Sequence, residues 1–340
     1  MNTKLHRGIP MNIENIALEF KCRVKSWKPL RAVYLVYTDR GPKIIKESKK
    51  EPEKLIYIHG LKEYLYSRGF HNLDRFLPSA SGLPFVINDN RIFIMEDYIE
   101  GRECSFSNPY DREGAMRTIA KLHICGRGYN PPLGAAERND IGKWEKTYLR
   151  KINDLENFKI QVRNKKKMDS FDKIFIQDVD FFMEMAWIAY DTLKNSKYDF
   201  LSKKADKEMP ICHHDYTYHN IIIGGKGAVN VIDFDYSCHE LPIYDVAAVI
   251  LRVMRRLSYD LDTALTMLYD YDLVRTISDD ELPLLMSLLE FPQKFWRLAN
   301  RYYSGKDGWS EKKFISKYYE IIDDKEFMID FLRDFRKVIM

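Results

Sequence analysis

The sequence predicts an α+β protein with two lobes, a small α/β lobe followed by a larger, mainly helical lobe that carries a β insert. Strand-like runs flank one helical segment in the first part of the chain, whereas helical spacing dominates after Gly101. The length of 340 residues also exceeds what one small core organises. We place the first lobe at residues 1–98, with about 1–14 mobile, and the second at 99–340, with the insert at 211–235.

Two β-hairpins are predicted in the first lobe. Val33–Tyr37 is rich in β-branched and aromatic residues, Thr38–Pro42 has the composition of a turn, and Lys43–Lys46 is a second strand-like run. The second hairpin consists of Phe85–Asn88 and Arg91–Met95, joined by the turn residues Asp89 and Asn90. Each pair of runs is short enough and close enough in the chain to form an antiparallel ladder.

One helix is predicted between these hairpins. Pro52–Arg68 carries Tyr57, Ile58, Leu61, Tyr64 and Leu65 at helical spacing, and Gly69 follows it. Glycine is common just beyond a helix end because it adopts positive φ without strain. The first lobe is therefore expected to have the order β-β-α-β-β.

The second lobe is expected to be helical apart from the insert. Its amphipathic segments are Arg112–His123, Phe175–Leu193 and Asp245–Leu257. The long segment 143–170 is polar and basic, and its Lys165-Lys166-Lys167 run is expected to be a solvated helix end. Within the insert, Ile211–Ile223 and Val229–Phe234 contain short strand-like runs around the turn 224–227.

Composition excludes several classes of protein. The 54 basic and 50 acidic residues nearly balance, which does not favour nucleic acid as a partner. No apolar run approaches the roughly 18 residues of a membrane span, and Met1–Met11 lacks an apolar signal core. The five cysteines are scattered and odd in number, as expected for reduced thiols. We therefore expect a cytoplasmic protein that binds neither nucleic acid nor membrane.

The motif His213-x-Asp215-x-x-x-x-Asn220, followed by Asp233 within the apolar run Val231–Phe234, points to a chemistry. Two carboxylates and an amide around short strands suit phosphoryl transfer from Mg-ATP. We expect Asp215, close to His213, to orient the acceptor hydroxyl and take its proton. Asn220 and Asp233 are expected to bind Mg²⁺ through their oxygens.

Other interpretations of these residues stay open at this point. Taken singly, Asp215 could be an ordinary turn residue and Asp233 a capping or salt-bridge residue. Asp235 could be a second metal contact or have no role. A zinc site is less favoured, because the spacing of the candidate ligands matches no common structural pattern. Those candidates are Cys212, His213, His214, His219, Cys238 and His239.

The first lobe supplies candidates for binding the nucleotide. Lys46, at the end of a predicted strand, could reach the phosphates, with the following helix providing a carboxylate partner. We favour Glu53 over Glu63 as that partner, because Glu63 projects away from the apolar side of the helix. The run 91–99 resembles a strand entering a hinge. There Met95 would pack near the base, and Glu96 and Tyr98 would offer backbone groups.

These residues resemble the aminoglycoside phosphotransferase-like kinases. That family has H-G-D-x-x-x-x-N, I-D-F and P-x-Y-D-h-A segments, where h is apolar. They match His213–Asn220, Ile232–Phe234 and Pro242–Ala247. The family's L-A-x-L-H helix is similar to Ile119–His123, and its hinge to Met95–Gly101. The resemblance runs from about residue 20 to 260.

Within that family the chain is most similar to spore coat proteins of the CotS group. The similar segments are Cys212–Tyr216, Tyr64–Phe70, Phe291–Phe295 and Tyr302-Tyr303. The resemblance implies a bilobal protein kinase-like fold, ATP and magnesium as cofactors and a small-molecule hydroxyl acceptor. It also implies expression in the mother cell of a spore-forming bacterium and deposition on the spore coat with other coat proteins.

The sequence departs from the family pattern at two places. His214 replaces the glycine of H-G-D, and Ser26–Arg31, where a phosphate-covering loop is expected, contains no glycine. Two hypotheses follow. The first is an active ATP- and magnesium-dependent phosphotransferase, which the retention of Lys46, Asp215, Asn220 and Asp233 favours. The second is a catalytically silent, kinase-like structural protein of the spore coat.

An aminoglycoside-inactivating enzyme is a third and less favoured interpretation. Polycationic substrates require an acidic pocket, whereas the segment 143–170 is basic. The acidic run Asp279–Glu281 is better explained as a helix start, since Ser278 and Glu281 have the spacing of a capping box. The sequence does not identify the acceptor.

Overall fold

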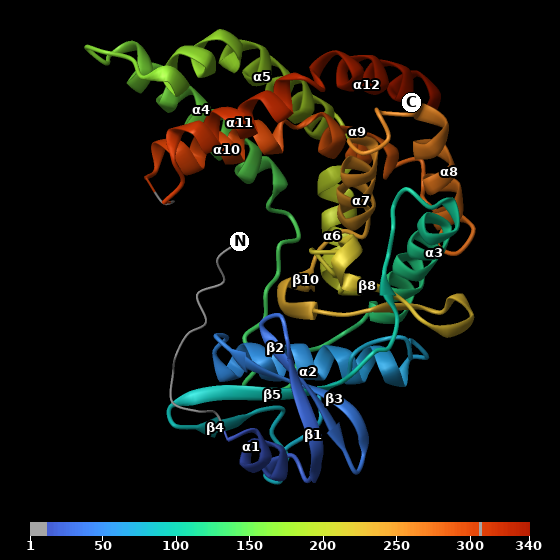
Figure 1. Cartoon of the computed structure of the whole chain (residues 1–340). Coiled ribbons are helices and arrows are strands. Elements are labelled where there is room, and N and C mark those ends of the chain that lie inside the picture. The colour runs from blue at the N-terminus through green and yellow to red at the C-terminus, as the bar shows by residue number, and fades with distance from the viewer. Residues whose placement is uncertain (1–11, 306–307) are drawn as a thin grey trace. The chain divides into compact units, whose positions relative to one another are not determined.

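The computed structural model describes residues 12–305 and 308–340, so the predicted mobile stretch 1–14 lies almost entirely outside the described residues. The chain divides into two compact units, and each is treated by itself below (Figure 1). The first unit comprises the chain up to Cys104, Tyr129–Arg138 and Tyr218–Ser237, and the second comprises Ser105–Gly128, Asn139–Thr217 and Cys238–Met340. The predicted lobe boundary at residue 98 stays a prediction.

The first unit is built on an antiparallel five-stranded sheet in the order β1-β2-β3-β5-β4. Its strands are β1 (Val24–Leu30), β2 (Val33–Thr38), β3 (Gly41–Ser48), β4 (Val86–Asn88) and β5 (Arg91–Asp97). Both predicted hairpins are present, and Asp89 and Asn90 adopt the positive φ that a tight hairpin turn requires. Strand β1, which the sequence analysis missed, occupies the segment where a phosphate-covering loop was expected.

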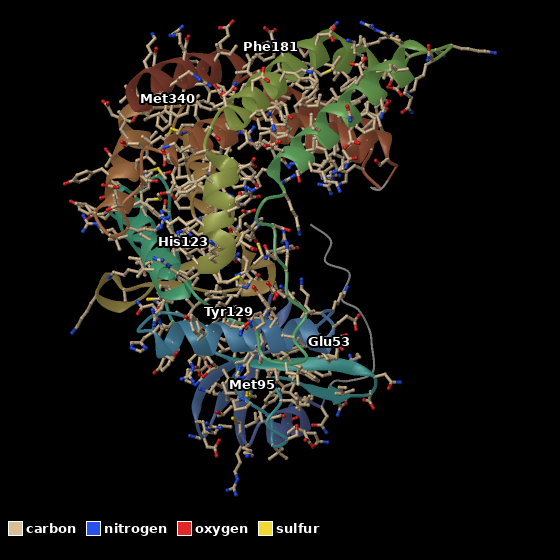
Figure 2. All side chains as sticks on the ribbon, turned by 180° about the vertical axis from the view of Figure 1, so that it is seen from behind. Glu53, Met95, His123, Tyr129, Phe181 and Met340 are labelled. Carbon is tan, nitrogen blue, oxygen red and sulfur yellow. The ribbon has the colours of Figure 1, made fainter. Side chains whose placement is uncertain are left out.

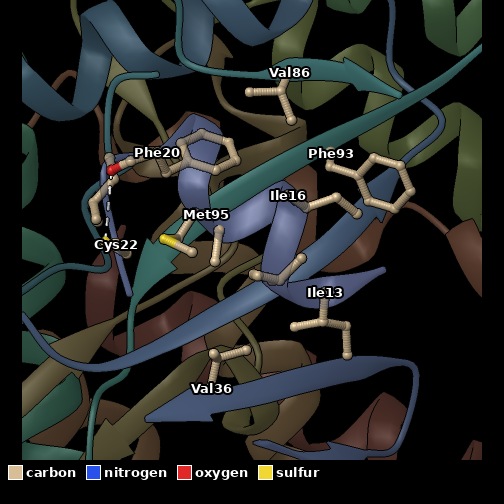
Figure 3. Packing of buried hydrophobic residues seen from close by; sticks show 11 residues of the cluster. Ile13, Ile16, Phe20, Cys22, Val36, Val86, Phe93 and Met95 are labelled. Atoms are coloured by element: carbon tan, nitrogen blue, oxygen red, sulfur yellow. Dashed lines mark hydrogen bonds between the residues drawn. The ribbon is translucent and has the colours of Figure 1, made fainter. Parts of the chain in front are cut away.

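Two helices of the first unit contact this sheet, α1 (Ile13–Glu19) and α2 (Pro52–Ser67). Helix α2 begins with proline at its first turn and ends before Gly69, whose φ is 92°, as predicted. Because side chains alternate along a strand, Ile45 and its cross-strand partner Met95 share one face of the sheet. They belong to a buried cluster with Ile13, Ile16 and Ala17 of α1 and with Phe20, which follows that helix (Figure 3).

A three-stranded sheet completes the first unit. Its order is β6-β8-β9, from β6 (Arg102–Glu103), β8 (Ile221–Ile223) and β9 (Val229–Val231). Gly101 precedes β6, and a Cβ there would lie 2.4 Å from the carbonyl oxygen of Ile223, so only glycine allows this close approach. The turn between β8 and β9 contains the short 3₁₀ helix Gly225–Gly227.

The second unit is mainly helical. Its helices are α3 (Pro109–Gly126), α4 (Trp144–Arg163), α5 (Ser170–Lys194), α6 (Tyr198–Glu208), α7 (Ile243–Met254), α8 (Leu261–Asp272), α9 (Leu282–Glu290), α10 (Gln293–Tyr303), α11 (Glu311–Ile322) and α12 (Lys325–Ile339). A two-stranded sheet pairs β7 (Ile211–Cys212) with β10 (Cys238–His239). The predicted helices over 112–123, 175–193 and 245–257 correspond to α3, α5 and α7. The predicted α+β class is therefore confirmed.

The basic segment 143–170 is helix α4 followed by a connection to α5. Lys166 and Lys167 are exposed there, as predicted. Lys165 instead pairs with the buried Asp172 at 2.7 Å and with the helix-capping residue Asp169 at 3.5 Å. In the described part of the chain, no helix is long and apolar enough to cross a membrane.

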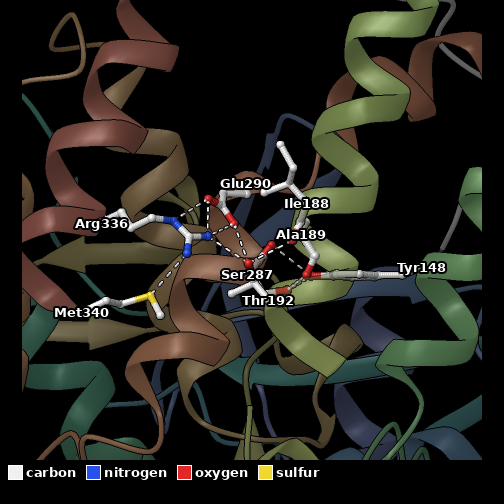
Figure 4. Close-up of polar contacts among 8 residues, drawn as sticks. All are labelled: Tyr148, Ile188, Ala189, Thr192, Ser287, Glu290, Arg336 and Met340. Carbon is white, nitrogen blue, oxygen red and sulfur yellow. Dashed lines mark hydrogen bonds and ion pairs between the residues drawn. The ribbon is translucent and has the colours of Figure 1, made fainter. Parts of the chain in front are cut away.

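Polar contacts join the last helix to the core of the second unit (Figure 4). Arg336 of α12 binds Glu290 of α9 at 2.6 Å and donates to Thr192 of α5 at 2.8 Å. Ser287 donates to the carbonyl of Ala189 at 2.7 Å, which joins α9 to α5. These contacts hold α5, α9 and α12 together within the second unit.

Candidate functional site

The first unit contains a buried cluster of alternating charges. The ammonium of Lys62 on α2 lies 2.9 Å from Glu96 on β5 and 2.9 Å from Asp74. Lys46 on β3 reaches the other oxygen of Glu96 at 3.4 Å. Glu96 is the cross-strand partner of Ile44, so it shares with Lys46 the face of the sheet opposite Met95. The cluster is thus a continuous chain, Lys46–Glu96–Lys62–Asp74.

Burial and charge act in opposite directions in this cluster. Burial alone would lower the pKa of Lys46, but the charges of Glu96, Asp235, Asp233 and Asp74 outweigh it and raise the pKa. Burial would raise the pKa of Glu96, yet Lys62 and Lys46 bring it below its ordinary value. For Asp74 burial dominates and raises the pKa to about 7. Lys46 therefore stays charged, as a phosphate-binding lysine must.

Asp233 continues this chain toward the β insert. Its backbone N–H donates to Asp74 at 3.2 Å, and its φ of 63° is left-handed. One carboxylate oxygen, Oδ1, is buried and has no hydrogen-bond partner within residues 12–305 and 308–340. A buried carboxylate oxygen without a partner is costly unless a cation binds it. Asp233 thus fits a metal ligand.

Asn220 lies beside Asp233 in the first unit. Its carbonyl accepts from the N–H of Ile232 at 2.9 Å, which continues the β8–β9 ladder, and its side chain is buried. Asp235, whose role the sequence left open, lies 3.6 Å from Lys50. Lys46, Asn220 and Asp233 therefore belong to the same unit, whereas the predicted lobe boundary at residue 98 separated Lys46 from the other two. Their roles stay predictions.

The carboxylate that pairs with Lys46 differs from the prediction. Glu53 is exposed in the first turn of α2 (Figure 2), and Glu63 binds Arg75. Glu96 takes the expected position instead, because α2 presents a lysine, Lys62, to this face of the sheet. A signal for this existed in the sequence, since Lys62 follows Ile58 by four residues on the apolar side of the helix.

The predicted hinge residues have other surroundings than expected. Met95 packs on the face of the sheet that carries α1, away from Lys46, which does not support a contact with a base beside Lys46. The Glu96 side chain belongs to the charged cluster. The N–H of Tyr98 donates to the carbonyl of Pro42 at 3.4 Å. Base binding by this segment stays a prediction.

The second unit contains the turn with the predicted catalytic carboxylate. Asp245 of α7 accepts the backbone N–H groups of His213 at 2.6 Å and His214 at 2.9 Å. A third group beside this carboxylate is the buried imidazole of His123 on α3, whose Nε2 lies 3.2 Å from Oδ2 of Asp245. His123 is labelled in Figure 2. Burial would raise the pKa of Asp245. The hydrogen bond from His123 and the charges of His123, His214 and His213 outweigh burial and lower this pKa to about 2. Asp245 therefore fixes the turn as a carboxylate.

His214 is accommodated in this turn in spite of the missing glycine. It adopts a left-handed φ of 67°, which a glycine would adopt without strain. Its ring stacks on Tyr244 with centroids 4.1 Å apart and an interplanar angle of 16°. The stacking contact and the Asp245 hydrogen bond offset the cost of this conformation.

Asp215 follows directly on the turn. Its backbone N–H donates to the buried His213 ring at 3.3 Å, so His213 positions the loop. The Asp215 carboxylate is partly exposed and lies 3.6 Å from Arg252 of α7. Arg252, which the sequence analysis missed, follows Asp245 by seven residues and therefore lies on the same side of α7.

Only three of the six zinc candidates lie in groups of possible metal ligands among the described residues. Cys212 groups with His123 and Asp245, and His214 and Cys238 group with Asp140. In the first group, Asp245 already accepts two N–H groups, and His123 contacts Tyr271 at 2.7 Å. Hydrogen bonding thus accounts for that group without an ion.

The small antiparallel sheet of the first unit and the mainly helical second unit give the chain a protein kinase-like fold. An aminoglycoside phosphotransferase from Alicyclobacillus acidocaldarius superposes with a TM-score of 0.84 at 17% identity, over 99% of both chains. Spectinomycin phosphotransferase in complex with ADP and spectinomycin gives 0.62 at 13% identity, covering 95% of this chain and 99% of that one. The predicted kinase-like fold is confirmed.

The family is shown by sequence. The family model described as "Spore coat putative kinase YutH" matches residues 14–335, and the chain belongs to this family. Spore coat protein S of Bacillus subtilis is 25% identical over 336 residues, covering 97% of this chain and 93% of that protein. A homoserine kinase of Rhizobium etli is 24% identical over 263 residues, covering 74% and 72%. The resemblance to spore coat proteins is confirmed.

Proposed function

We propose that this protein is an ATP- and magnesium-dependent phosphotransferase that phosphorylates a hydroxyl group of a small molecule. One observation carries the proposal: a buried Asp233 oxygen without a hydrogen-bond partner among the described residues, held in the same charged network as Lys46. A network of this kind would hold a metal and a phosphate next to each other.

The first unit would bind Mg-ATP. Lys46 would contact the phosphates, and Asp233 and Asn220 would hold Mg²⁺, which neutralises phosphate charge when bound. Glu96 would keep Lys46 in position, and Asp74 would keep the backbone of Asp233 in its left-handed conformation. Met95, Tyr98 and Glu53 stay candidates for contacts with the nucleotide from the sequence alone.

The second unit would supply the acid–base group. As the acceptor oxygen bonds to the γ-phosphorus, the bond from that phosphorus to the bridging oxygen breaks and ADP leaves. The hydroxyl proton passes to the carboxylate of Asp215. Asp245 and His213 orient the turn that carries Asp215.

The relatives support this proposal and its setting. They include homoserine kinases, a spectinomycin phosphotransferase with bound ADP, and a choline kinase from Streptococcus pneumoniae with a TM-score of 0.50. Spore coat protein S and the endospore coat-associated protein YutH support association with the spore coat. Synthesis in the mother cell stays an expectation from the sequence resemblance. Coat proteins are then expected partners.

A catalytically silent coat protein is the second candidate. The observation that favours it is strand β1, which occupies the glycine-free segment Ser26–Arg31 where backbone amides would otherwise approach the phosphates. The silent form would either fail to bind magnesium and ATP together or bind them without turnover, so absence of binding would favour it.

The test is thermal unfolding with and without Mg-ATP. Ligand binding stabilises the fold by RT ln(1 + [L]/Kd), so wild type should melt higher with millimolar Mg-ATP. Asp233→Ala should lose the magnesium-dependent part of the shift. Asp206→Ala, which changes an exposed aspartate of α6, should keep it. Equal melting temperatures with and without Mg-ATP would reject the phosphotransferase in favour of the silent coat protein.

A further inference from the structure

Four basic residues of the second unit gather near the predicted catalytic carboxylate. They are Arg150 and Lys151 of α4, Arg252 of α7 and Arg297 of α10, and we call them the basic cluster. Arg150 and Lys151 both lie over the ring of Trp296, at 5.8 and 5.0 Å from its centroid, and Arg297 is the next residue of α10. Together with burial, the charge of Arg297 lowers the pKa of both Lys151 and Arg252, and Arg150 and Arg297 are themselves exposed. For the residues that the structure describes, no carboxylate lies within ion-pair distance of Arg150, Lys151 or Arg297.

Lys151 shows how little negative charge is available in this region. Its ammonium donates to the neutral amide oxygen of Gln293 at 2.6 Å. It also lies 5.2 Å from the ring of Phe291 and 5.0 Å from that of Trp296. Burial, followed by the charges of Arg150 and Arg297, lowers the pKa of Lys151 to about 7. Holding a half-buried lysine charged with no carboxylate partner costs free energy.

Arg252 connects the basic cluster to the catalytic turn. One of its guanidinium nitrogens lies 3.6 Å from Asp215. Another, Nη1, is buried and has no hydrogen-bond partner within the described ranges. A guanidinium presents its donors in a planar fork that matches a carboxylate or phosphate, so Nη1 is a ready donor for such a group.

Nearby carboxylates do not neutralise the basic cluster. Asp154 accepts from the indole N–H of Trp296 at 3.0 Å, and it is the only acidic group that raises the pKa of Lys151. Asp215 and Asp245 offset part of the charge of Arg252, but Asp245 already accepts two backbone N–H groups. Three arginines and the protonated fraction of Lys151 therefore have Asp154 and Asp215 as their nearby counter-charges.

We propose that the acceptor alcohol carries an anionic group, a carboxylate or a phosphate, which the basic cluster binds while the hydroxyl approaches Asp215. The inference rests on the proposed phosphotransferase activity and adds its substrate class. The bound anion supplies the missing counter-charge. Because Arg252 lies 3.6 Å from Asp215, an anion on Arg252 orients the hydroxyl of the same molecule toward Asp215. A polycationic aminoglycoside would instead meet four like charges.

The segment Phe291–Trp296 gains a role from this assignment. Phe291, Gln293 and Trp296 surround the ammonium of Lys151, and Arg297 follows on the next position of α10. The sequence resemblance to spore coat proteins included Phe291–Phe295 without a function. In the structure, side chains of this segment surround the Lys151 ammonium with uncharged groups.

The test measures binding to the full chain without nucleotide. The probes are 4-hydroxybutanoate, its uncharged amide, 4-amino-1-butanol and inorganic phosphate, at constant ionic strength. Isothermal titration and melting temperature should detect the two anions and neither of the other alcohols. Arg297→Gln should weaken anion binding about tenfold or more, since it removes a charge-assisted hydrogen bond. Lys294→Gln, an exposed residue of the same helix, should leave it unchanged.

The outcomes separate this inference from the proposed activity. Anion binding that Arg297→Gln weakens, with no response to Mg-ATP, would retain the anion site and reject the kinase. A magnesium-dependent ATP response with equal binding of all three alcohols, or with no binding of either anion, would overturn the inference. Anion binding that Arg297→Gln and Lys151→Met leave unchanged would also overturn it, because the site would then lie elsewhere.

Discussion

The charged cluster of the first unit and the basic cluster of the second use lysine in opposite ways. Lys62 is buried between Glu96 and Asp74, each 2.9 Å away, so its charge is compensated on both sides. Lys151 is half-buried against two aromatic rings and one amide, with no carboxylate at ion-pair distance among the described residues. The first arrangement is complete within the protein, whereas the second lacks a counter-ion.

This difference separates fixing a geometry from holding a ligand. A paired and hydrogen-bonded network loses much of its free energy when one member is removed, because the remaining charge is then buried alone. It therefore suits the residues that position a phosphate and a metal. An unpaired cation raises the free energy of the unliganded protein. This cost is removed when an anion binds to the cation. It therefore suits a substrate pocket.

Replacement of Lys62 should give the largest effect. Lys62→Met keeps the volume but leaves Glu96 and Asp74 buried without their cation, which should lower the free energy of unfolding by about 3–5 kcal/mol. Urea denaturation monitored by circular dichroism measures this loss. The triple variant Lys62→Met/Glu96→Gln/Asp74→Asn removes the charges together and should recover much of it. A loss below about 1 kcal/mol in the single variant would show that the cluster is not a closed network.

The second largest effect should come from low pH, which weakens the hydrogen bonds of Asp245 to the backbone of His213 and His214. The pKa of Asp245 falls from its ordinary value of 3.8 to about 2 in the fold. A depressed carboxyl pKa contributes stability that is present above pH 4 and is lost as the pH falls toward 2, by about 2.5 kcal/mol in total. Denaturation curves from pH 6 to 2 should show this loss in wild type. In Asp245→Asn it should be absent, and a parallel decline in both proteins would contradict the assignment.

The pairing of Lys46 predicts a smaller, local effect. Glu96→Gln should weaken Mg-ATP binding about tenfold, or about 1.4 kcal/mol, because Lys46 loses its charged partner. Glu53→Gln should leave binding unchanged, since Glu53 is exposed and pairs with neither lysine. Calorimetric titration of both variants with Mg-ATP shows which glutamate supports nucleotide binding. Weaker binding by Glu53→Gln than by Glu96→Gln would restore Glu53 as the partner of Lys46, as the sequence favoured.

Removal of Lys151 should destabilise the fold least. Lys151→Met replaces a cation that lacks a carboxylate partner by an apolar side chain among Phe291, Gln293 and Trp296, so the free energy of unfolding at pH 7 should not fall and should rise. The lowered pKa of Lys151 means that wild type gains stability as the pH rises from about 7 toward 10.5, where the unfolded lysine also loses its proton. The variant should lack that gain. Destabilisation as large as that of Lys62→Met would remove the contrast between the two clusters.

The sequence by itself determined the local elements and the motif. Both hairpins and helix α2 followed from alternation, helical spacing and the positions of glycine and proline, which act within a few residues of the chain. The order of Asp215, Asn220 and Asp233 likewise indicated the chemistry before any fold was known. Strand β1 was missed because the search there was for a glycine-rich loop.

The tertiary structure decided which charges meet. Glu96 pairs with Lys46 because β3 and β5 are neighbours in the sheet and both side chains point to one face, and the same alternation places Met95 on the other face. Arg150, Lys151, Arg252 and Arg297 come from three helices that are far apart in the sequence. Local spacing describes each helix alone, whereas the cost of a buried charge depends on every chain segment around it. That dependence is why the proposal of an anion-binding cluster rests on the fold and not on the sequence.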